Sequence, residues 1–355
     1  MNPALWALLL AVPAFAQDPG PVVARVMSRV DALVAREPGH DALLIDGLDR
    51  RAEALFAEIS PLGWRAAGPL GDAARQPGRS PKARIFAVTF LSKLRDPAAF
   101  GPLSEVLLDR EQDADVRLSA AQGLNGLDAP PKAARRTFCA ALAEPDAPRP
   151  VSDQVLIALA RLGCDDPAPL TAAARAFGAR PSAADLASAR SALTALGLSP
   201  GEAAARDLIA LVGWYPPGGA ARAAAVSALA RHRADLATTL LPRALPAVRE
   251  ALRTETDSPA TMLDLIALAD SFGPAGDELL LPLASHPDPE VLAAAAEALA
   301  RRKATAALPR LEEILAGALA DPRYAPKPGR PDPAFLLSRL ESAVQILRRA
   351  SAARK

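Results

Sequence analysis

A leucine recurs along the chain at intervals of 31 to 39 residues, each time at the end of a segment that resembles A-x-x-A-L. A repeat of this period signals an array of helical units, because each unit buries its apolar face only by stacking on its neighbours. Much of the apolar half of the chain is alanine, the strongest helix former, and few runs alternate with period two. We therefore predict an all-α fold, an α-solenoid of antiparallel helix pairs forming a superhelix. The repeat leucines are Leu91, Leu124, Leu159, Leu193, Leu229, Leu268 and Leu299.

The residues before each repeat leucine predict the second helix of a pair. The segment Asp113–Leu127 shows the pattern most clearly, with an acidic start, then Val116, Arg117 and an alanine pair. Asp288 followed by Pro289 has the form of an N-cap and a first helical residue. We predict second helices at 81–95, 114–127, 151–163, 183–197, 219–232, 259–272 and 288–302, with first helices between them, such as 98–109, 131–144 and 200–215.

The sequence around this array predicts five segments. Residues 19–37 and 41–59 have apolar residues at helical spacing but depart from the later period, as terminal repeats do. The stretch that follows is rich in glycine and proline, which predicts a loop with at most a short helix near 69–75. The segments are a signal peptide (1–16), an N-terminal helical cap (17–60), a loop (61–79), the repeat array (80–322), and a C-terminal capping helix with a basic tail (323–355).

The first sixteen residues have the pattern of a secretory signal peptide. Leu5–Val12 is a short apolar run, and Ala14–Ala16 has the A-x-A form of a cleavage signal, although no Lys or Arg precedes the run. The run is too short to span a bilayer, and no later stretch is long and apolar enough to do so. We expect cleavage after Ala16 and a periplasmic or secreted bacterial protein; the alternatives are an uncleaved anchor or a misassigned start codon.

The chain has two cysteines, Cys139 and Cys164, and an oxidising compartment would permit a bridge between them. If each lies on one of two straight antiparallel helices, their levels differ by about 12 Å at helical rise. A disulfide needs Cα atoms within about 7 Å. This geometry favours two buried free thiols, and a bridge would need a shifted register.

These repeats resemble the short HEAT-repeat family described as phycobilisome-lyase HEAT-like, most strongly at 113–127 and 288–299. Tetratricopeptide repeats have a similar period, but their Trp/Gly/Tyr/Ala/Pro pattern is absent. In the HEAT family the second helices line the concave face, and an Asp/Arg ladder ties neighbouring units together. The resemblance implies such a structural ladder role for Arg84, Arg117 and Arg222, each seven residues before a repeat leucine. The other units lack this arginine, so the ladder is incomplete.

Helical geometry selects the residues that would meet a partner in a groove. At 100° per residue, the positions five before, two before and two after each repeat leucine point away from that leucine. Cations occupy the last position in alternate units, which predicts a spaced basic ridge suited to an extended acidic segment of another protein. The alternative is that these cations complement the helix dipole and cover apolar surface. On the helices at 81–95 and 114–127 the three positions hold Phe86, Thr89, Lys93, Ser119, Gln122 and Gly126. The predicted groove residues are Lys93, Gln122, Arg161, Arg231, Glu297 and Arg301.

Trp214 and Tyr215 stand before a Pro-Pro-Gly-Gly turn and form the other candidate for partner binding. Exposed aromatic residues on a turn can anchor a partner. The alternative is that they plug the edge of the solenoid.

The charge and the motifs limit the function classes. A formal net charge of +1 gives no general attraction to nucleic acid. No metal-binding, nucleophile-elbow or phosphate-loop motif is present, so we expect no cofactor and no metal, and predict that the chain is not an enzyme. The sequence favours a scaffold that binds another protein in the groove of the solenoid within the cell envelope. The alternative is an enzyme or a chromophore-lyase-like protein that holds a small molecule in the groove.

Overall fold

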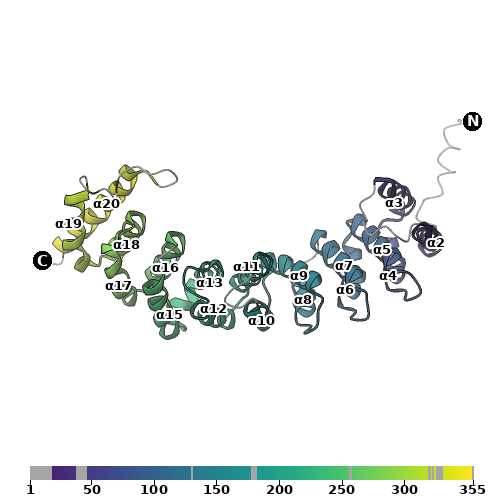
Figure 1. Ribbon diagram of the computed structural model, residues 1–355, viewed down its shortest axis with the longest axis horizontal. Helices are drawn as coiled ribbons and strands as arrows, with labels where there is room; N and C mark the ends of the chain where they lie inside the picture. The colour runs from purple at the N-terminus through teal and green to yellow at the C-terminus, as the bar shows by residue number, and fades with distance from the viewer. Residues whose placement is uncertain are drawn as a thin grey trace, which may run out of the picture. The chain divides into compact units, whose positions relative to one another are not determined.

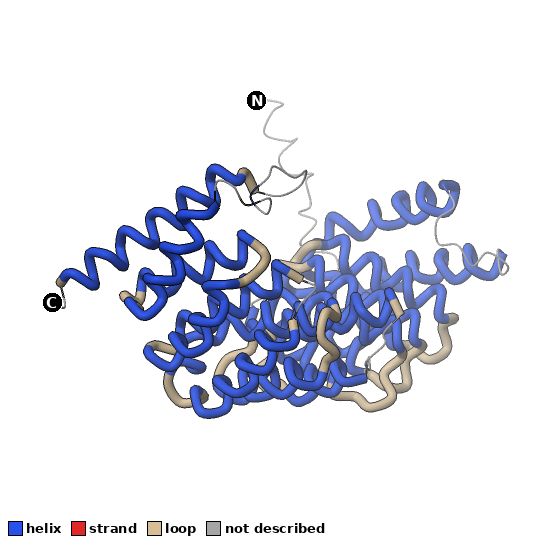
Figure 2. The backbone as a smooth tube through the Cα atoms, turned by 60° about the vertical axis from the view of Figure 1, so that its left-hand side comes forward, coloured by secondary structure: helices blue, strands red, loops and turns tan. Residues whose placement is uncertain are grey.

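The structure is a computed structural model that describes residues 18–36, 46–128, 131–176, 182–255, 258–318, 321, 324 and 331–353. Regular structure in these ranges is helical, and none of their residues lies in a strand (Figure 1, Figure 2). The prediction of an all-α fold is therefore confirmed. The chain divides into two compact units, Met1–Leu159 and Ala160–Lys355, and the boundary falls within α9 (Arg149–Leu162).

Unit 1 is built from helices that pack in two rows. In one row α4, α6 and α8 follow one another, and in the other α5 packs on α7, while α4 and α6 also contact α5 and α7. This pattern, in which each helix touches only near neighbours along the chain, is that of a helical repeat. The elements of unit 1 before α9 are α2 (Pro19–Arg36), α3 (Asp46–Ile59), η2 (Ser60–Ala66), α4 (Ala67–Arg75), α5 (Pro81–Leu94), η3 (Pro97–Ala99), α6 (Phe100–Leu108), α7 (Ala114–Gly126) and α8 (Pro131–Leu142).

Unit 2 repeats the two-row arrangement. The second helices α11, α13, α16, α18 and α20 form one row of successive contacts, and α12, α15 and α17 form another. The elements are α10 (Ala168–Ala176), α11 (Ala183–Leu198), α12 (Glu202–Trp214), α13 (Ala220–Leu229), η4 (Ala230–His232), α14 (Arg233–Ala237), α15 (Leu241–Thr254), α16 (Pro259–Ser271), α17 (Pro274–Leu280), η5 (Leu281–Ser285), α18 (Pro289–Arg301), η6 (Thr305–Ala307), α19 (Leu308–Gly317) and α20 (Pro333–Ala352).

The predicted second helices are present, and their ends lie within two residues of the predicted ends when η4 is counted with α13. Side-chain caps mark the starts of several of them. The carboxylates of Asp113 and Asp288 accept hydrogen bonds from backbone N–H groups in the first turn, and Pro289 occupies the first helical position. All seven repeat leucines are at most 2% exposed. Each buried leucine contributes about 1.5 to 3 kcal/mol relative to an exposed one, so the repeat leucines form the core that holds each pair to the next.

The loop predicted at 61–79 is wrong at its start, which forms a 3-10 helix, whereas the short helix expected near 69–75 is present. Residues 60–66 form η2, and residues 67–75 form α4, which buries Leu70 and Ala74 and packs on α5 and α6. Glycine, which suggested a loop, serves a packing role here. A Cβ on Gly71 would lie 2.6 Å from Pro102 Cβ, so only glycine lets α4 approach α6 this closely.

The expectation of free thiols is also wrong, since Cys139 and Cys164 are both disulfide-bonded. The expectation assumed that Cys164 extends the helix before it. Instead α9 ends at Leu162, and Gly163 adopts a left-handed conformation, with φ at 69°, that turns the chain away from the helix axis. The Cys164 backbone N–H then donates to Ser199 Oγ over 2.9 Å.

The predicted signal peptide at 1–16 lies outside the described residues, as does the boundary at 322–323 between the array and the C-terminal segment. The helix of that last segment is α20, which opens on the N-cap Asp332 and packs on α18 and α19. In the described part of the chain, no helix has the length and apolarity to cross a membrane.

Candidate functional site

A pocket of about 400 Å³ opens between α5 and α7 in unit 1, where α3 also contributes. Half of its lining residues stand at the positions at which we expected the second helices to face a groove. Of the six residues predicted for these two helices, only Gly126 is not part of the lining. The lining residues are Ala52, Ile85, Phe86, Thr89, Phe90, Ser92, Lys93, Ser119, Gln122 and Gly123.

The floor of the pocket is aromatic. Phe86 and Phe90 on α5 are both buried, with ring centroids 6.2 Å apart, and Phe56 of α3 lies 5.8 Å from Phe90. Tilted ring pairs at these separations stabilise a core beyond the area they bury. Phe86, which is 7% exposed, is the ring of this cluster that can contact a molecule in the pocket, and its packing on Phe90 fixes its position.

Close approach of α5 and α7 forms the back of the pocket. Gly123 on α7 has no side chain, and a Cβ there would lie 2.1 Å from Ser92 Oγ on α5 and 3.4 Å from Leu103 Cδ1. The hydroxyl of Ser92 donates to the Val88 carbonyl over 2.9 Å, which holds Ser92 in this position. A glycine at position 123 thus sets the width of the pocket.

The rim of the pocket carries one cation. Lys93 forms an ion pair with Glu53 of α3, and its Nζ lies 5.9 Å from the centroid of the Phe56 ring. The side chains of Lys93 and Glu53 are 37% and 59% exposed, so water screens the pair. None of the lining residues is an aspartate or a glutamate, and Glu53 itself does not line the pocket.

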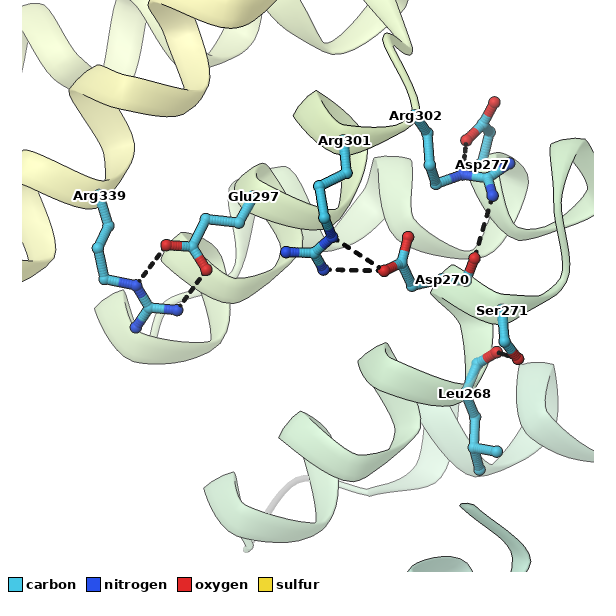
Figure 3. A network of polar contacts seen from close by, with 8 residues as sticks. All are labelled: Leu268, Asp270, Ser271, Asp277, Glu297, Arg301, Arg302 and Arg339. Carbon is cyan, nitrogen blue, oxygen red and sulfur yellow. Dashed lines mark hydrogen bonds and ion pairs between the residues drawn. The ribbon is translucent and has the colours of Figure 1, made fainter. Parts of the chain in front are cut away.

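In unit 2 the predicted groove residues Glu297 and Arg301 belong to a chain of ion pairs (Figure 3). The guanidinium of Arg301 on α18 donates to Asp270 of α16 over 2.8 and 3.1 Å. Glu297 on α18 accepts two hydrogen bonds, both of 2.6 Å, from Arg339 of α20. Hydrogen bonding from Arg339 lowers the pKa of Glu297 below its ordinary value. The two pairs tie three successive second helices together.

A further arginine completes this network. Arg302 pairs with Asp277 over 2.5 Å and donates to the backbone carbonyls of Asp270, at 3.1 Å, and Gly273. These carbonyls lie at and after the end of α16, where helix carbonyls lack intrahelical partners. Arg302 therefore caps α16 from the end of α18, which stabilises the repeat interface.

Two of the four cations predicted to form a basic ridge have acidic partners on neighbouring helices. Lys93 is paired with Glu53, and Arg301 is paired with Asp270. Arg161, at the end of α9, and Arg231, in η4, are exposed. These acidic partners of Lys93 and Arg301 were not predicted from the sequence, and the basic ridge stays a prediction. A single-sequence pattern could not show this, since the acids stand 40 and 31 residues away.

The aromatic pair separates into one buried and one exposed residue. Tyr215 is 2% exposed, and its hydroxyl donates to the Ala174 carbonyl of α10 over 2.8 Å. Burial raises the pKa of Tyr215 to about 12. Trp214 is 45% exposed and packs edge-on against Tyr215, with ring centroids 5.0 Å apart. The prediction that Tyr215 meets a partner is therefore wrong, because its polar end is used inside unit 2.

Replacing Tyr215 with phenylalanine should lower the free energy of unfolding by about 1 to 2 kcal/mol. The Ala174 carbonyl lies in the last turn of α10 and is buried, and the substitution removes the hydroxyl that donates to it. The measurement is urea unfolding of the full chain followed by circular dichroism. The control is Trp214→Phe, which keeps an aromatic ring at the exposed position and should leave the midpoint unchanged. An equal shift in both variants would contradict the capping role.

The three predicted ladder arginines lie in different environments. Arg117 is buried on α7; its Nε donates to the Leu107 carbonyl over 3.0 Å, and its two terminal nitrogens bind the carboxylate of Glu144 after α8. Arg84 donates to the side chain of Gln112 over 2.6 Å. Arg222 is buried, but its Nε has no hydrogen-bond partner within the described residues. Arg117 thus spans three successive helices of unit 1.

Sequence reasoning missed the residues that form ion pairs with several of the predicted site residues. Glu53, Glu144 and Arg339 each complete an ion pair with a predicted residue on another helix. Their separations from those partners run from 27 to 42 residues, so no local pattern marks them. The one signal that could have indicated them is the repeat period, which brings residues about one unit apart to neighbouring positions.

In the described part of the chain, no group of three His, Cys, Asp or Glu side chains gathers closely enough to hold a metal ion. The buried His232 is used in packing, with Nε2 placed 3.1 Å from the Leu196 carbonyl.

No family model matches the chain, and no curated protein matches it. Among solved structures, the chain is similar to human deoxyhypusine hydroxylase in complex with glycerol. The two share 19% sequence identity with a TM-score of 0.31, over 80% of this chain and 100% of the hydroxylase chain. At this TM-score the likeness carries no argument about what the present chain binds or does.

The prediction that the chain is not an enzyme is withdrawn: the similar structure is that of a hydroxylase, and although a match at this TM-score says nothing about the activity of this chain, it gives the exclusion no support. That prediction relied on the lack of a recognisable catalytic motif. In a helical repeat, side chains from separate units can meet without leaving a motif in the sequence. The lack of a motif therefore does not exclude catalysis, and we withdraw the exclusion.

Proposed function

We propose that the chain is an exported helical-repeat protein that binds a segment of another protein in the pocket between α5 and α7. The observation that carries this proposal is the composition of the pocket lining. Residues that helical geometry alone selects as outward-facing line a hollow with an aromatic floor and a polar rim. Apolar pockets with a few placed polar groups are the usual form of a binding site.

Two observations support export. The first is the signal-peptide pattern of residues 1–16. The second is the disulfide-bonded state of Cys139 and Cys164, because structural disulfides persist in oxidising compartments and are rare in the cytosol. Both fit a periplasmic or secreted protein.

A second candidate function is the binding of a small molecule in the same pocket. The volume of about 400 Å³ favours it, since small-molecule sites typically measure about 300 to 1,000 Å³. Native mass spectrometry of the chain purified from its host separates the two candidates. A bound mass of a few hundred daltons that is lost in Ser119→Trp would favour the small molecule.

Photo-cross-linking in the native host tests whether a protein partner binds at the pocket. A photoreactive phenylalanine analogue replaces Gln122 at the pocket, and in a matched strain it replaces Lys132, an exposed residue of α8. We expect one protein adduct from position 122, none of the same mass from position 132, and loss of the adduct when Ser119→Trp fills the pocket. Identical adducts at both positions, or an adduct that survives Ser119→Trp, would refute the proposed site.

A further inference from the structure

The floor of the pocket limits what can bind there. Phe86 and Phe90 lie buried beneath it, and Phe56 closes on Phe90 from α3. An aromatic floor offers apolar area and few polar groups. Binding there is therefore most favourable for a ligand side chain that buries apolar area of its own. The floor therefore selects an aromatic or large aliphatic side chain.

The rim selects a negative charge beside that side chain. Lys93 is the one charged residue among the lining residues. Its present partner, Glu53, is 59% exposed and is not among the lining residues. An ion pair this exposed contributes little to stability, so an incoming carboxylate can replace Glu53 at small cost.

The wall between floor and rim suits the backbone of an extended segment. The hydroxyls of Ser92 and Ser119 donate to carbonyls of their own helices over 2.9 and 2.8 Å, which leaves their oxygens able to accept from a ligand N–H. The amide of Gln122 is exposed and both donates and accepts. An extended backbone presents N–H and C=O groups alternately, so it can bond to both kinds of group.

From these three features we infer that the pocket recognises an extended segment of the partner protein in which an aspartate or glutamate stands within two residues of a large apolar side chain. The spacing follows from the size of the pocket. Lys93 and Phe86 line one pocket of about 400 Å³, so the acidic and the apolar side chain of the segment must lie close together, and two residues of extended chain rise about 6.6 Å. The inference rests on the proposed function and adds the chemistry of the ligand to it.

The test uses a random heptapeptide library displayed on phage and selected on the full chain, with counter-selection on Ser119→Trp. We expect enriched peptides to carry an acidic residue within two positions of Phe, Leu, Ile, Met or Trp. Enrichment of basic or purely polar peptides would overturn the inference, as would no enrichment over the Ser119→Trp variant.

Charge variants then test the role of Lys93 with one enriched peptide. Lys93→Glu should weaken binding of that peptide at least tenfold and shift a repeat selection toward basic residues. Glu53→Gln should tighten binding severalfold, because it removes the competing carboxylate. The matched control Lys132→Glu changes the same charge on α8 and should leave binding unchanged. Equal losses of peptide affinity in Lys93→Glu and Lys132→Glu would show that Lys93 does not recognise the acidic residue of the peptide.

The two proposals fail in different ways. If the cellular adduct at position 122 forms and maps to a partner segment without an acidic residue near an apolar one, the ligand chemistry is wrong and the binding site stands. If the adduct does not form, the binding site itself is wrong.

Discussion

Replacing Arg117 with methionine should lower the free energy of unfolding of unit 1 by about 3 kcal/mol. Arg117 is buried, and its removal leaves the carboxylate of Glu144 and the carbonyl of Leu107 without their donor. Breaking a buried ion pair costs about 3 to 5 kcal/mol; we expect the lower end because the Glu144 side chain keeps 11% of its surface in contact with water. The measurement is hydrogen exchange of the amides in α7 and α8, read by mass spectrometry on the full chain.

Two controls separate the buried pair from general damage. Adding Glu144→Leu to Arg117→Met should recover most of the loss, because an apolar pair of similar volume has no unpaired charge to bury. Arg253→Met removes an arginine from the exposed pair with Glu250 and should leave exchange unchanged. A loss in Arg117→Met no larger than that in Arg253→Met would show that the pair is unimportant.

The same pair predicts a pH dependence. Hydrogen bonding and the charge of Arg117 lower the pKa of Glu144 in the folded chain below its unfolded value. The pair therefore stabilises the fold fully above the unfolded pKa, and this contribution is lost as the pH falls through the folded pKa. Between about pH 6 and pH 3, the difference in stability between the native chain and Glu144→Gln should shrink. A constant difference across this range would exclude titration of Glu144 as its cause.

Replacing Phe90 with alanine should cost about 3 to 5 kcal/mol, the usual range for removal of a buried aromatic ring. Phe90 is fully buried and packs on both Phe56 and Phe86. Its loss opens a cavity under the pocket floor and separates α3 from α5. Hydrogen exchange of amides in α5 and urea unfolding of the full chain report the loss.

The control for Phe90 is Trp64→Ala, which removes a larger ring from a side chain that is 63% exposed. This variant should change the unfolding midpoint little. Phe90→Leu, which keeps apolar volume, should recover much of the stability but weaken binding of a selected peptide, because the aromatic floor is lost. If Phe90→Leu binds the peptide as well as the native chain does, the floor has no part in recognition.

The helices of this chain were predictable because their periodicity is local. In α7, for example, the repeat leucine, the alanine pair and the capping aspartate lie within about fifteen residues, and the structure places them in the core or at the helix start. The outward face of α5 and α7 was predictable for the same reason, since 100° per residue fixes which side chains point away from Leu91 and Leu124.

The errors arose where the role of a residue depends on its backbone conformation or on contacts with residues distant in the sequence. Glycine and proline suggested a loop at 61–66, where the chain forms η2, and Gly163 turns the chain where a straight helix was assumed. Trp214 and Tyr215 are adjacent, and only the packing of α10 decides which of them is buried. The ion-pair partners of Lys93 and Arg301 come from other helices, so composition within one helix could not reveal them.

The two-row contact pattern has a consequence for how the chain is made. From α4 onward, a second helix packs on the first helices beside it and on the next second helix of its unit, so the contacts that complete it are separated by little more than one repeat of 31 to 39 residues. Folds with such low contact order form quickly, because little conformational entropy is lost in closing loops before stabilising contacts form. During synthesis, which starts at the N-terminus, the chain can therefore fold one helix pair at a time, and each pair is completed once the next pair has been synthesised.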